Sequence, residues 1–524
     1  MRRIGIDVGG TNTDAVLIAG SNVVRAVKTA TTADVTGGIL AALKALSRFP
    51  EVTGQPIDAV MIGTTHFINA VVQGRSLNRV GALRIGLPAG ATLPPFCDWP
   101  PALADLVRGE VAMVEGGHDY DGRPFMPLDR AAVTAAAHRF AAAGLKAVAI
   151  ASVFSPIDPS CETEAAEIVR TIIPDAAITC SHELGRIGLL ERENAALMNA
   201  ALAELARETV AAFEAAIAES GLKAPLYITQ NDGTVMLAAH AMRQPVLSFA
   251  SGATNSMRGA AFLSGIADAM VIDVGGTTTD IGQLRHGFPR EANGVVEVGG
   301  VRTLFRMPDL LSIGLGGGSH VEADGDVVGP LSVGHRLTTE ALVFGGSRLT
   351  TSDVAVAAGM LELGDRARVA HLDPALIGRM LARAHAMVEE NVDRMKTDSA
   401  PLPLIAVGGG AFLVPDAVAG TSQVVRVTHG DCANAVGAAI AQVSGEIDQV
   451  FQGMGRTEAV AAATGLAQDR AVAAGADAAT LQTIEVEDIP LAYLPGNALR
   501  VRVRVVGILG RRASRRRPPP AAPS

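Results

Sequence analysis

The sequence predicts an α/β protein, and two observations carry this prediction. Apolar runs typical of strands alternate with long alanine-rich stretches typical of helices, notably 189–219 and 374–395. The octapeptide DVGGTNTD at residues 7–14 also returns almost unchanged as DVGGTTTD at residues 273–280. Because 524 residues are too many for one hydrophobic core, we expect about two to four domains.

Composition and charge narrow the class of protein. With 48% hydrophobic and 19% charged residues the chain is ordinary globular protein, and its net charge of −9 argues against nucleic acid or an anionic membrane as the main partner. The four cysteines show neither zinc-site nor disulfide spacing, which indicates a reducing cytoplasm. The opening MRRIGID leaves no room for a signal peptide, and no apolar run reaches membrane-spanning length. We expect a cytoplasmic protein with no nucleic-acid or membrane partner.

Each copy of the repeat is predicted to form a strand–turn–strand hairpin. Apolar residues precede and follow the glycine pair in both copies, as in IGIDV before Gly9 and AMVIDV before Gly275. Two glycines at a hairpin tip allow several N–H groups to converge into a concavity that binds anions, above all phosphates. Asp7 and Asp273 end their strands at the same point, so a divalent cation, best Mg²⁺, should separate each carboxylate from a phosphate. Threonine hydroxyls would add donors: Thr11, Thr13, Thr277, Thr278 and Thr279.

Later segments add further turns and helices. SIGLGGGSH at 312–320 and AVGGGAFLVP at 406–415 are glycine-rich turns, although an ordinary tight turn explains the first equally well. Residues 431–443 (DCANAVGAAIAQV) are predicted to form a helix with small residues suited to close packing. Residues 111–133 predict a hairpin with DYDG at its turn and a helix capped by Asp129; a metal site there is the less favoured interpretation. From about residue 510 the basic, proline-rich chain predicts a disordered tail, solvated rather than bound to nucleic acid.

The two common nucleotide-binding loops are excluded by their spacing. A Walker loop requires Gly-Lys followed by Ser or Thr, and no lysine of this chain follows a glycine. A dinucleotide fingerprint requires its glycines between a strand and a helix, whereas here they join two strands.

The ordered motifs resemble a known family. The twin hairpins, the late VGGGAF turn and the small-residue helix resemble the actin/sugar-kinase/Hsp70 superfamily of ATPases. Within it the chain looks like the hydantoinase A/oxoprolinase family, through RRIGIDVGGTNTDAVLI, IGTTHFINAVVQGR, ITQNDGTVM, DVGGTTTDIGQL, IGLGGGS, GPLSVG and ANAVGAA in that order. Two segments depart from its pattern: HFI at 66–68, and SGATNSMRG at 251–259 in place of Ser-Gly-Pro-Ala-Gly-Gly.

The resemblance implies a fold and a division of the chain. We expect two duplicated actin-like (ribonuclease H-like) ATPase domains closing on a nucleotide cleft, each contributing one phosphate loop. The first would span residues 1–185 and the second, with the adenosine-side turn, residues 186–506; the tail would occupy 507–524.

The resemblance also implies site residues. Asp7 and Asp273 are assigned to Mg²⁺ and to orienting the attacking group, with Thr65 and His66 as substrate-side catalytic candidates, although a satisfied polar role for His66 is the commoner one. The residues expected to bind ATP are Gly9, Gly10, Thr11, Asn12, Thr13, Gly275, Gly276, Thr277, Thr278, Thr279, Gly316, Gly317, Gly408, Gly409 and Gly410, the last three against adenosine.

The implied activity is ATP-dependent opening of a cyclic amide such as a hydantoin or 5-oxoproline, by an oligomer that could need a separate hydrolytic subunit. A small-molecule kinase and a partner-dependent regulatory ATPase of the same superfamily remain alternatives. A chaperone or filament-forming member ranks below these. No residue pattern distinguishes hydantoin, oxoproline, another lactam or a ketone to be carboxylated.

Overall fold

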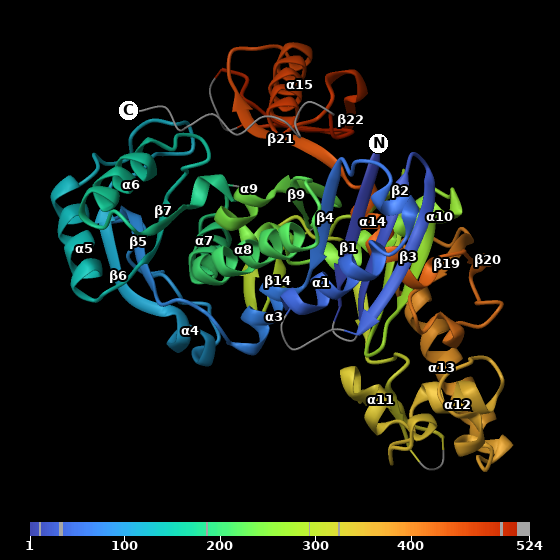
Figure 1. Ribbon diagram of the computed structural model, residues 1–524. Coiled ribbons are helices and arrows are strands. Elements are labelled where there is room, and N and C mark those ends of the chain that lie inside the picture. The colour runs from blue at the N-terminus through green and yellow to red at the C-terminus, as the bar shows by residue number, and fades with distance from the viewer. Residues whose placement is uncertain are drawn as a thin grey trace.

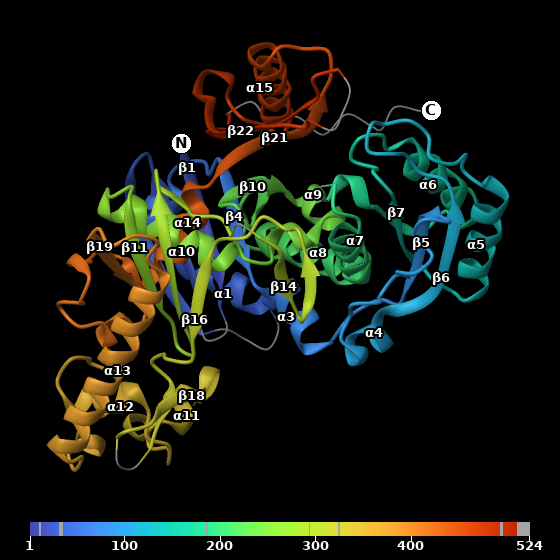
Figure 2. The same ribbon diagram turned by 180° about the vertical axis from the view of Figure 1, so that it is seen from behind.

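The structure is a computed structural model that describes residues 1–9, 12–30, 35–184, 187–292, 294–322, 325–492 and 496–510. Figures 1 and 2 show two central sheets, a smaller α/β lobe on one side, and a C-terminal extension above them. Among the described residues, no helix has both the length and the apolar character needed to cross a bilayer. All four cysteines are free thiols.

The first sheet has nine strands in the order β22-β23-β21-β10-β9-β4-β1-β2-β3. Strand β1 pairs antiparallel with β2 and parallel with β4, which pairs parallel with β9. The strands are β1 (Arg2–Val8), β2 (Asn12–Ala19), β3 (Asn22–Ala30), β4 (Ala59–Thr64), β9 (Leu226–Thr229), β10 (Thr234–Leu237), β21 (Gln442–Phe451), β22 (Gln482–Pro490) and β23 (Leu499–Gly507).

The second sheet repeats the pairing of the first. Strand β11 pairs antiparallel with β12 and parallel with β19, which pairs parallel with β20. Outside β12 lie β13 and β16, both antiparallel to it, as β3 is to β2. The strands are β11 (Ala269–Val274), β12 (Thr279–Arg285), β13 (Phe288–Pro289), β16 (Leu310–Ile313), β19 (Leu402–Val407) and β20 (Thr421–Arg426). The order β3-β2-β1-β4-β9 thus recurs as β16-β12-β11-β19-β20, which confirms the predicted duplication.

Two helices fill the space between the sheets, and glycines let them approach. Helix α14 (Ala433–Ile440) packs on β1 and β2, while α10 (Ser251–Ser264) packs on β11 and β19. A Cβ on Gly437 of α14 would lie 1.8 Å from the carbonyl oxygen of Asn255, and one on Gly5 of β1 would lie 2.0 Å from that of Ala435. The helices therefore contact each other backbone to backbone, and the two sheets are held at a fixed separation.

A separate four-stranded parallel sheet builds the lobe on the left of Figure 1. Its strands are β5 (Val80–Leu87), β6 (Arg108–Glu115), β7 (Ala147–Ser152) and β8 (Ala177–Cys180), with helices α4 (Pro101–Val107), α5 (Arg130–Ala142) and α6 (Ser160–Ile172). As predicted, Asp129 caps α5, its carboxylate accepting from the Ala132 N–H at 2.9 Å. The predicted hairpin before it is reduced to an isolated bridge between His118 and Pro124.

The remaining elements surround these sheets. The other helices are α1 (Val35–Leu46), α2 (Pro50–Thr53), α3 (His66–Gln73), α7 (Leu189–Ala201), α8 (Ala203–Glu219), α9 (Ala238–Arg243), α11 (Leu337–Glu340), α12 (Thr351–Ala357), α13 (Pro374–Met395) and α15 (Arg456–Ala473). Two short hairpins are β14 (Val296–Val298) with β15 (Val301–Thr303), and β17 (Ser319–Val321) with β18 (Val328–Ser332).

The structure divides one predicted helical stretch in two and shortens another predicted helix. Residues 189–219 form two helices that meet at Leu202, because α7 packs toward the small lobe's sheet and α8 packs with α1 on the first sheet. Helix α14 covers only 433–440, and Gln442 already begins β21. The prediction for 374–395 is confirmed by α13, which Asp373 caps and Pro374 begins.

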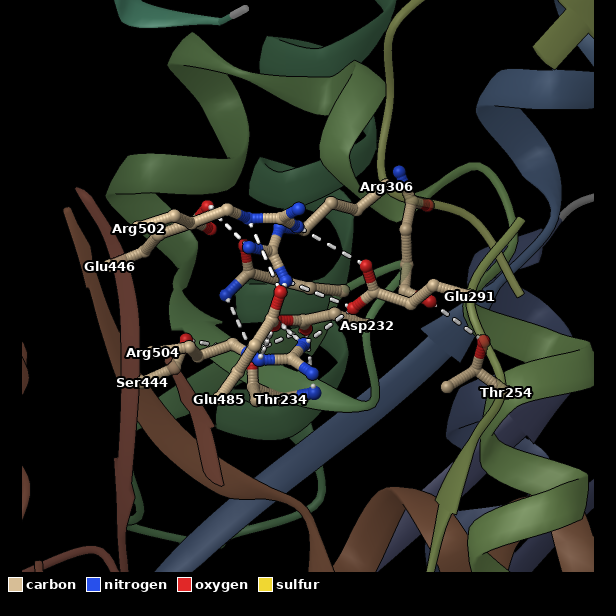
Figure 3. A network of polar contacts seen from close by, with 12 residues as sticks. Asp232, Thr234, Thr254, Glu291, Arg306, Ser444, Glu446, Glu485, Arg502 and Arg504 are labelled. Atoms are coloured by element: carbon tan, nitrogen blue, oxygen red, sulfur yellow. Dashed lines mark hydrogen bonds and ion pairs between the residues drawn. The ribbon is translucent and has the colours of Figure 1, made fainter. Parts of the chain in front are cut away.

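The C-terminal strands are fixed to the sheets by a network of charges (Figure 3). Arg306, which precedes β16, contacts Glu291, Glu446 and Glu485 at 2.6 to 3.0 Å. Arg504 of β23 contacts Asp232 and Glu291, each at 3.1 Å. The first sheet contains strands from both sides of residue 185, so the sheets themselves do not mark the predicted domain boundary there. The division of the chain at residue 185 remains a prediction. Of the predicted tail, residue 507 ends β23 and Gly510 donates to the Gly475 carbonyl at 2.9 Å; residues 511–524 lie outside the described part.

Candidate active site

A row of polar side chains crosses the first sheet where β1 ends. In the strand register Asp7 of β1 lies opposite Asp14 of β2, which lies opposite Lys28 of β3. On its other side Asp7 is level with Gly63 of β4. Directly opposed residues share a face of the sheet, and a Cβ on Gly63 would lie 3.2 Å from Asp7 Oδ1. The absence of a side chain at Gly63 leaves that space to the Asp7 carboxylate.

Asp7 is a buried carboxyl, 7% exposed, in a negative environment. Burial is the main cause that raises its pKa to about 7, and the charges of Asp14 and Asp273 add to the effect. Asn434 opposes it by donating from Nδ2 to Asp7 Oδ2 at 3.3 Å. Such a carboxyl is a strong candidate ligand for a cation.

Asp273 occupies the equivalent place in the second sheet, opposite Asp280 of β12. Burial raises its pKa to about 6, while the Ser256 side chain of α10 favours the ionised form. Its charge also contributes to the raised pKa of Asp7. The two aspartates, 266 residues apart in the sequence, are therefore close enough to interact electrostatically.

The tips of both hairpins close by the same bond. The Gly9 N–H donates to the Asn12 carbonyl at 3.0 Å, and the Gly275 N–H donates to the Thr278 carbonyl at 2.9 Å. Thr277 and Thr278 are exposed, but the Thr279 hydroxyl is buried and donates to the Leu315 carbonyl at 2.6 Å. Thr13 is also buried. The predicted residues Gly10 and Thr11 lie outside the described residues.

The predicted turn at Gly316 and Gly317 supports the second hairpin from behind. The N–H groups of Gly317 and Gly318 donate to the carbonyls of Gly275 and Gly276 at 3.0 and 2.7 Å, and the Gly316 N–H donates to Ser319 Oγ at 2.8 Å. A Cβ on Gly316 would lie 2.6 Å from the Thr277 nitrogen. These amides are thus engaged in holding the tip.

The turn at Gly408, Gly409 and Gly410 lies directly against Asp273. Gly408 has a φ of +88° and leaves no room for a Cβ, which would lie 2.3 Å from Asp273 Oδ1. The Gly410 N–H donates to the Val274 carbonyl at 2.7 Å. Beside the turn is a cavity of about 510 Å³, whose lining includes Gly408, Phe412, Arg426 and His429.

Thr65 and His66 lie at the start of α3, one step beyond the end of β4. Thr64 is level with Val8 in the register, and its carbonyl accepts from Ser251 Oγ at 3.3 Å. A Cβ on Gly252 would lie 3.4 Å from Thr65 Cγ2, so this corner also contacts the start of α10. Burial lowers the pKa of His66, which favours the neutral imidazole.

Four polar residues of this region escaped the sequence-based prediction: Lys28, Asn255, Ser256 and Asn434. Asn255 Nδ2 donates to Thr229 Oγ1 at 2.9 Å, while its buried Oδ1, like that of Asn434, has no hydrogen-bond partner in the described part of the chain. The motif ANAVGAA contains Asn434, and the unusual segment SGATNSMRG contains Asn255 and Ser256, so both motifs held a usable signal. Lys28 carried none, because only strand pairing brings it here.

One group with metal-ligand side chains lies elsewhere, in the small lobe. Glu162, Cys180 and His182 have ligand atoms within 4.8 Å of one another. The Glu162 carboxylate already accepts from the Ser152 N–H at 2.7 Å and from Ser181 Oγ at 2.6 Å, and contacts His182 Nδ1 at 2.6 Å. Burial raises the pKa of the Cys180 thiol. This is a satisfied structural cluster.

Comparisons with known proteins agree with the geometry. Residues 3–173 match the family described as hydantoinase/oxoprolinase N-terminal region, and residues 192–368 match the family described as hydantoinase/oxoprolinase, together about two-thirds of the chain. The caprolactamase subunit alpha of Pseudomonas jessenii is 28% identical over 392 residues, 69% of this chain and 55% of that protein. The acetophenone carboxylase gamma subunit of Aromatoleum aromaticum is 24% identical, over 68% of this chain and 53% of that protein. The chain spans about half the length of these curated relatives.

A solved structure supports the fold. The ATP-dependent caprolactamase from Pseudomonas jessenii superposes with a TM-score of 0.74 at 20% identity, over 97% of this chain and 88% of that one. The predicted α/β class and the predicted duplication are confirmed by this likeness and by the repeated strand order.

Proposed function

The chain belongs to the hydantoinase/oxoprolinase family, and from that premise we propose that it is an ATP-dependent enzyme, or enzyme subunit, that activates a cyclic amide for ring opening. The observation that carries the proposal is the meeting of the two glycine-threonine hairpins, with Asp7 and Asp273 close enough that the charge of one raises the pKa of the other. A triphosphate bound there would be held from both sheets at once.

The residues fit a hard cation. Asp7 and Asp273 offer carboxylate oxygens whose pKa values are raised mainly by burial, and Asn434 Oδ1 is a buried oxygen with no hydrogen-bond partner in the described part of the chain. Oxygen donors of this kind are what Mg²⁺ prefers. A Mg²⁺ ion bound by the two aspartates would neutralise the phosphates.

The chain's own residues would position the triphosphate and the carbonyl. Gly9, Asn12 and Thr13 would line one side of the phosphates, and residues 275–279 the other, with the turn at 316–318 fixing the second tip. The cavity beside Gly408 would accept the nucleoside, with Phe412 in its wall. Thr65 and His66, next to the end of β4, would face the amide.

In the proposed reaction the lactam oxygen takes the γ-phosphoryl group of ATP, which forms a carbon–oxygen–phosphorus linkage and releases ADP. One water then attacks the activated carbon and the ring C–N bond breaks; a second water releases inorganic phosphate and the ring-opened acid. Positioning and charge neutralisation are the enzyme's main contributions to such transfers. A neutral His66 could accept a proton from the attacking water.

A partner-dependent ATPase is the second candidate. It is favoured because two relatives are by name subunits, a caprolactamase subunit alpha and a carboxylase gamma subunit. In that case phosphate release would require a second polypeptide.

The test is phosphate release from Mg·ATP by the purified protein with hydantoin, 5-oxoproline, caprolactam and a polyol panel, with and without the product of a neighbouring gene. We expect stimulation by at least one cyclic amide and its loss in Asp273→Asn. Stimulation by polyols alone would instead establish a kinase. Stimulation by the added protein in the absence of any amide would establish a regulatory ATPase.

A further inference from the structure

The outer neighbours of the two hairpins differ, although the hairpins themselves are repeats. In the first sheet the register runs Lys28–Asp14–Asp7. In the second sheet the corresponding row runs Ser312–Asp280–Asp273. The duplication thus makes these positions directly comparable. The Lys28 ammonium faces Asp14 in the first sheet, whereas the Ser312 hydroxyl faces Asp280 in the second and donates to it.

Lys28 is bound from two sides. Its Nζ lies 2.8 Å from Asp14 Oδ1 and donates to the Asp431 carbonyl at 3.1 Å. Asp431 comes just before α14, which carries the Asn434 that contacts Asp7. Lys28 therefore joins the edge of the first sheet to the start of the helix that packs between the two sheets.

The Lys28 side chain is partly exposed and lines a cavity that a charged ligand could enter. Lys28 lines a cavity of about 360 Å³ with Arg25, Phe49 and Cys432, and this cavity shares His429 and Asp431 with the one beside Gly408. The Lys28 side chain is 36% exposed, whereas that of Asp14 is only 11% exposed.

Without Lys28, the buried carboxylates of Asp14 and Asp7 would lie side by side, near that of Asp273, with no ion-pair partner for Asp14 among the described residues. Asp14 lies directly opposite Asp7 in the strand register, and Lys28 Nζ lies 2.8 Å from Asp14 Oδ1, so Lys28 supplies the positive charge of this row. A triphosphate entering the cleft is itself strongly anionic, and an uncompensated carboxylate beside its metal ligand would repel it.

We propose that Lys28 is a positioning residue of the nucleotide site, which neutralises Asp14 so that Asp7 can receive a metal-bound triphosphate. This inference rests on the proposed nucleotide-binding function. It predicts that the net charge of the Lys28–Asp14 pair, rather than the lysine itself, sets nucleotide affinity.

The test is calorimetric titration of Mg·AMP-PNP into the wild type, Lys28→Met, Lys28→Arg and the double variant Lys28→Met/Asp14→Asn. Lys28→Met leaves one negative charge, and we expect its Kd to rise about tenfold. The double variant restores neutrality and should return to within about threefold of the wild type, as should Lys28→Arg. Lys44→Met is the matched control. Among the described residues, the one ion pair of Lys44 is with the exposed Glu219, at 2.9 Å.

Four outcomes separate the hypotheses. A wild-type Kd for Lys28→Met overturns the role of Lys28, and a double variant as weak as Lys28→Met overturns the charge explanation. Thermal unfolding of each variant identifies any that fails to fold. If Lys28→Met does not fold, the double variant and Lys28→Arg carry the test. Either of these refutes the proposal if it folds but binds Mg·AMP-PNP more than about tenfold more weakly than the wild type does. If the wild type itself binds no Mg·AMP-PNP, the proposed function fails as well.

Discussion

Asp7 and Asp273 are ionisable carboxyl groups in buried positions, where the charged form is unfavourable. Burial raises the pKa of Asp7 from 3.8 to about 7 and that of Asp273 to about 6. A carboxyl with a higher pKa in the folded state binds its proton more tightly there than in the unfolded chain. Its contribution to stability is therefore present at low pH and is lost as pH rises between the two values, 3.8 and about 7 for Asp7.

The protein free of metal and nucleotide should consequently lose thermal stability from pH 5 to pH 7.5. Asp7→Asn and Asp273→Asn should each flatten this slope and raise Tm at pH 7.5 by a few degrees, while abolishing ATP turnover, because the buried negative charge serves the ligand rather than the fold. Differential scanning fluorimetry across pH, with and without Mg·ATP, measures both effects. An unchanged slope in both variants would show that these carboxyls are ionised without penalty.

At the residue scale, the sequence was enough to predict the site residues of the hairpins, but it predicted fewer of the residues around them. Asp7 and Asp273 could be chosen because they end strands just before paired glycines. Lys28 could not, since its proximity to Asp7 is created by pairing of β2 with β3. Asn255 and Asn434 stand in motifs that the sequence showed, but only the packing of α10 and α14 brings them to this site. That the N–H groups of Gly316 and Gly317 hold other atoms of the chain was likewise invisible in a glycine-rich motif.

Among the elements, α10 and α14 decide how the two domains face each other. Their contact depends on Gly437, where a Cβ would lie 1.8 Å from the Asn255 carbonyl oxygen, and on Gly259, where it would lie 2.0 Å from the Ala433 carbonyl oxygen. Both neighbours are backbone atoms, so they cannot yield without moving a helix.

Gly437→Ala should destabilise the protein by about 1–3 kcal/mol through overpacking. It should also weaken Mg·ATP binding, because α14 carries Asn434 to Asp7. Gly465→Ala in α15 is the matched control, since nothing lies within 4 Å of its Cβ, and it should be neutral or stabilise by about 0.5–1 kcal/mol. Urea unfolding and nucleotide titration compare the two. Equal behaviour of the two variants would contradict the close-packing account.

Patterns of apolar residues located most elements but not their ends. The alanine-rich run at 189–219 is uniformly helical in composition, and only tertiary packing breaks it at Leu202. The helix predicted over 431–443 ends early because Gln442 pairs with Thr234 and so enters the first sheet. Where a cap was predicted, at Asp129, the structure has it, and α5 begins directly after it.

At the scale of the whole molecule, the repeated octapeptide foretold the duplication but not how the rest attaches to it. The first sheet is completed by β21, β22 and β23, which come more than 430 residues after β1. The charges in Figure 3 join those strands to Asp232 of the β9–β10 turn and to Glu291 and Arg306, which flank β14 and β15. Long-range ion pairs of this kind leave no local pattern.

The central claim is that both hairpins hold one triphosphate, and a crystal structure with Mg·AMP-PNP tests it most directly. We expect the phosphates within hydrogen-bond distance of the tips at 9–13 and 275–279, the metal between Asp7 and Asp273, and the base beside Gly408. A nucleotide bound to one hairpin alone, or elsewhere on the protein, would contradict the account.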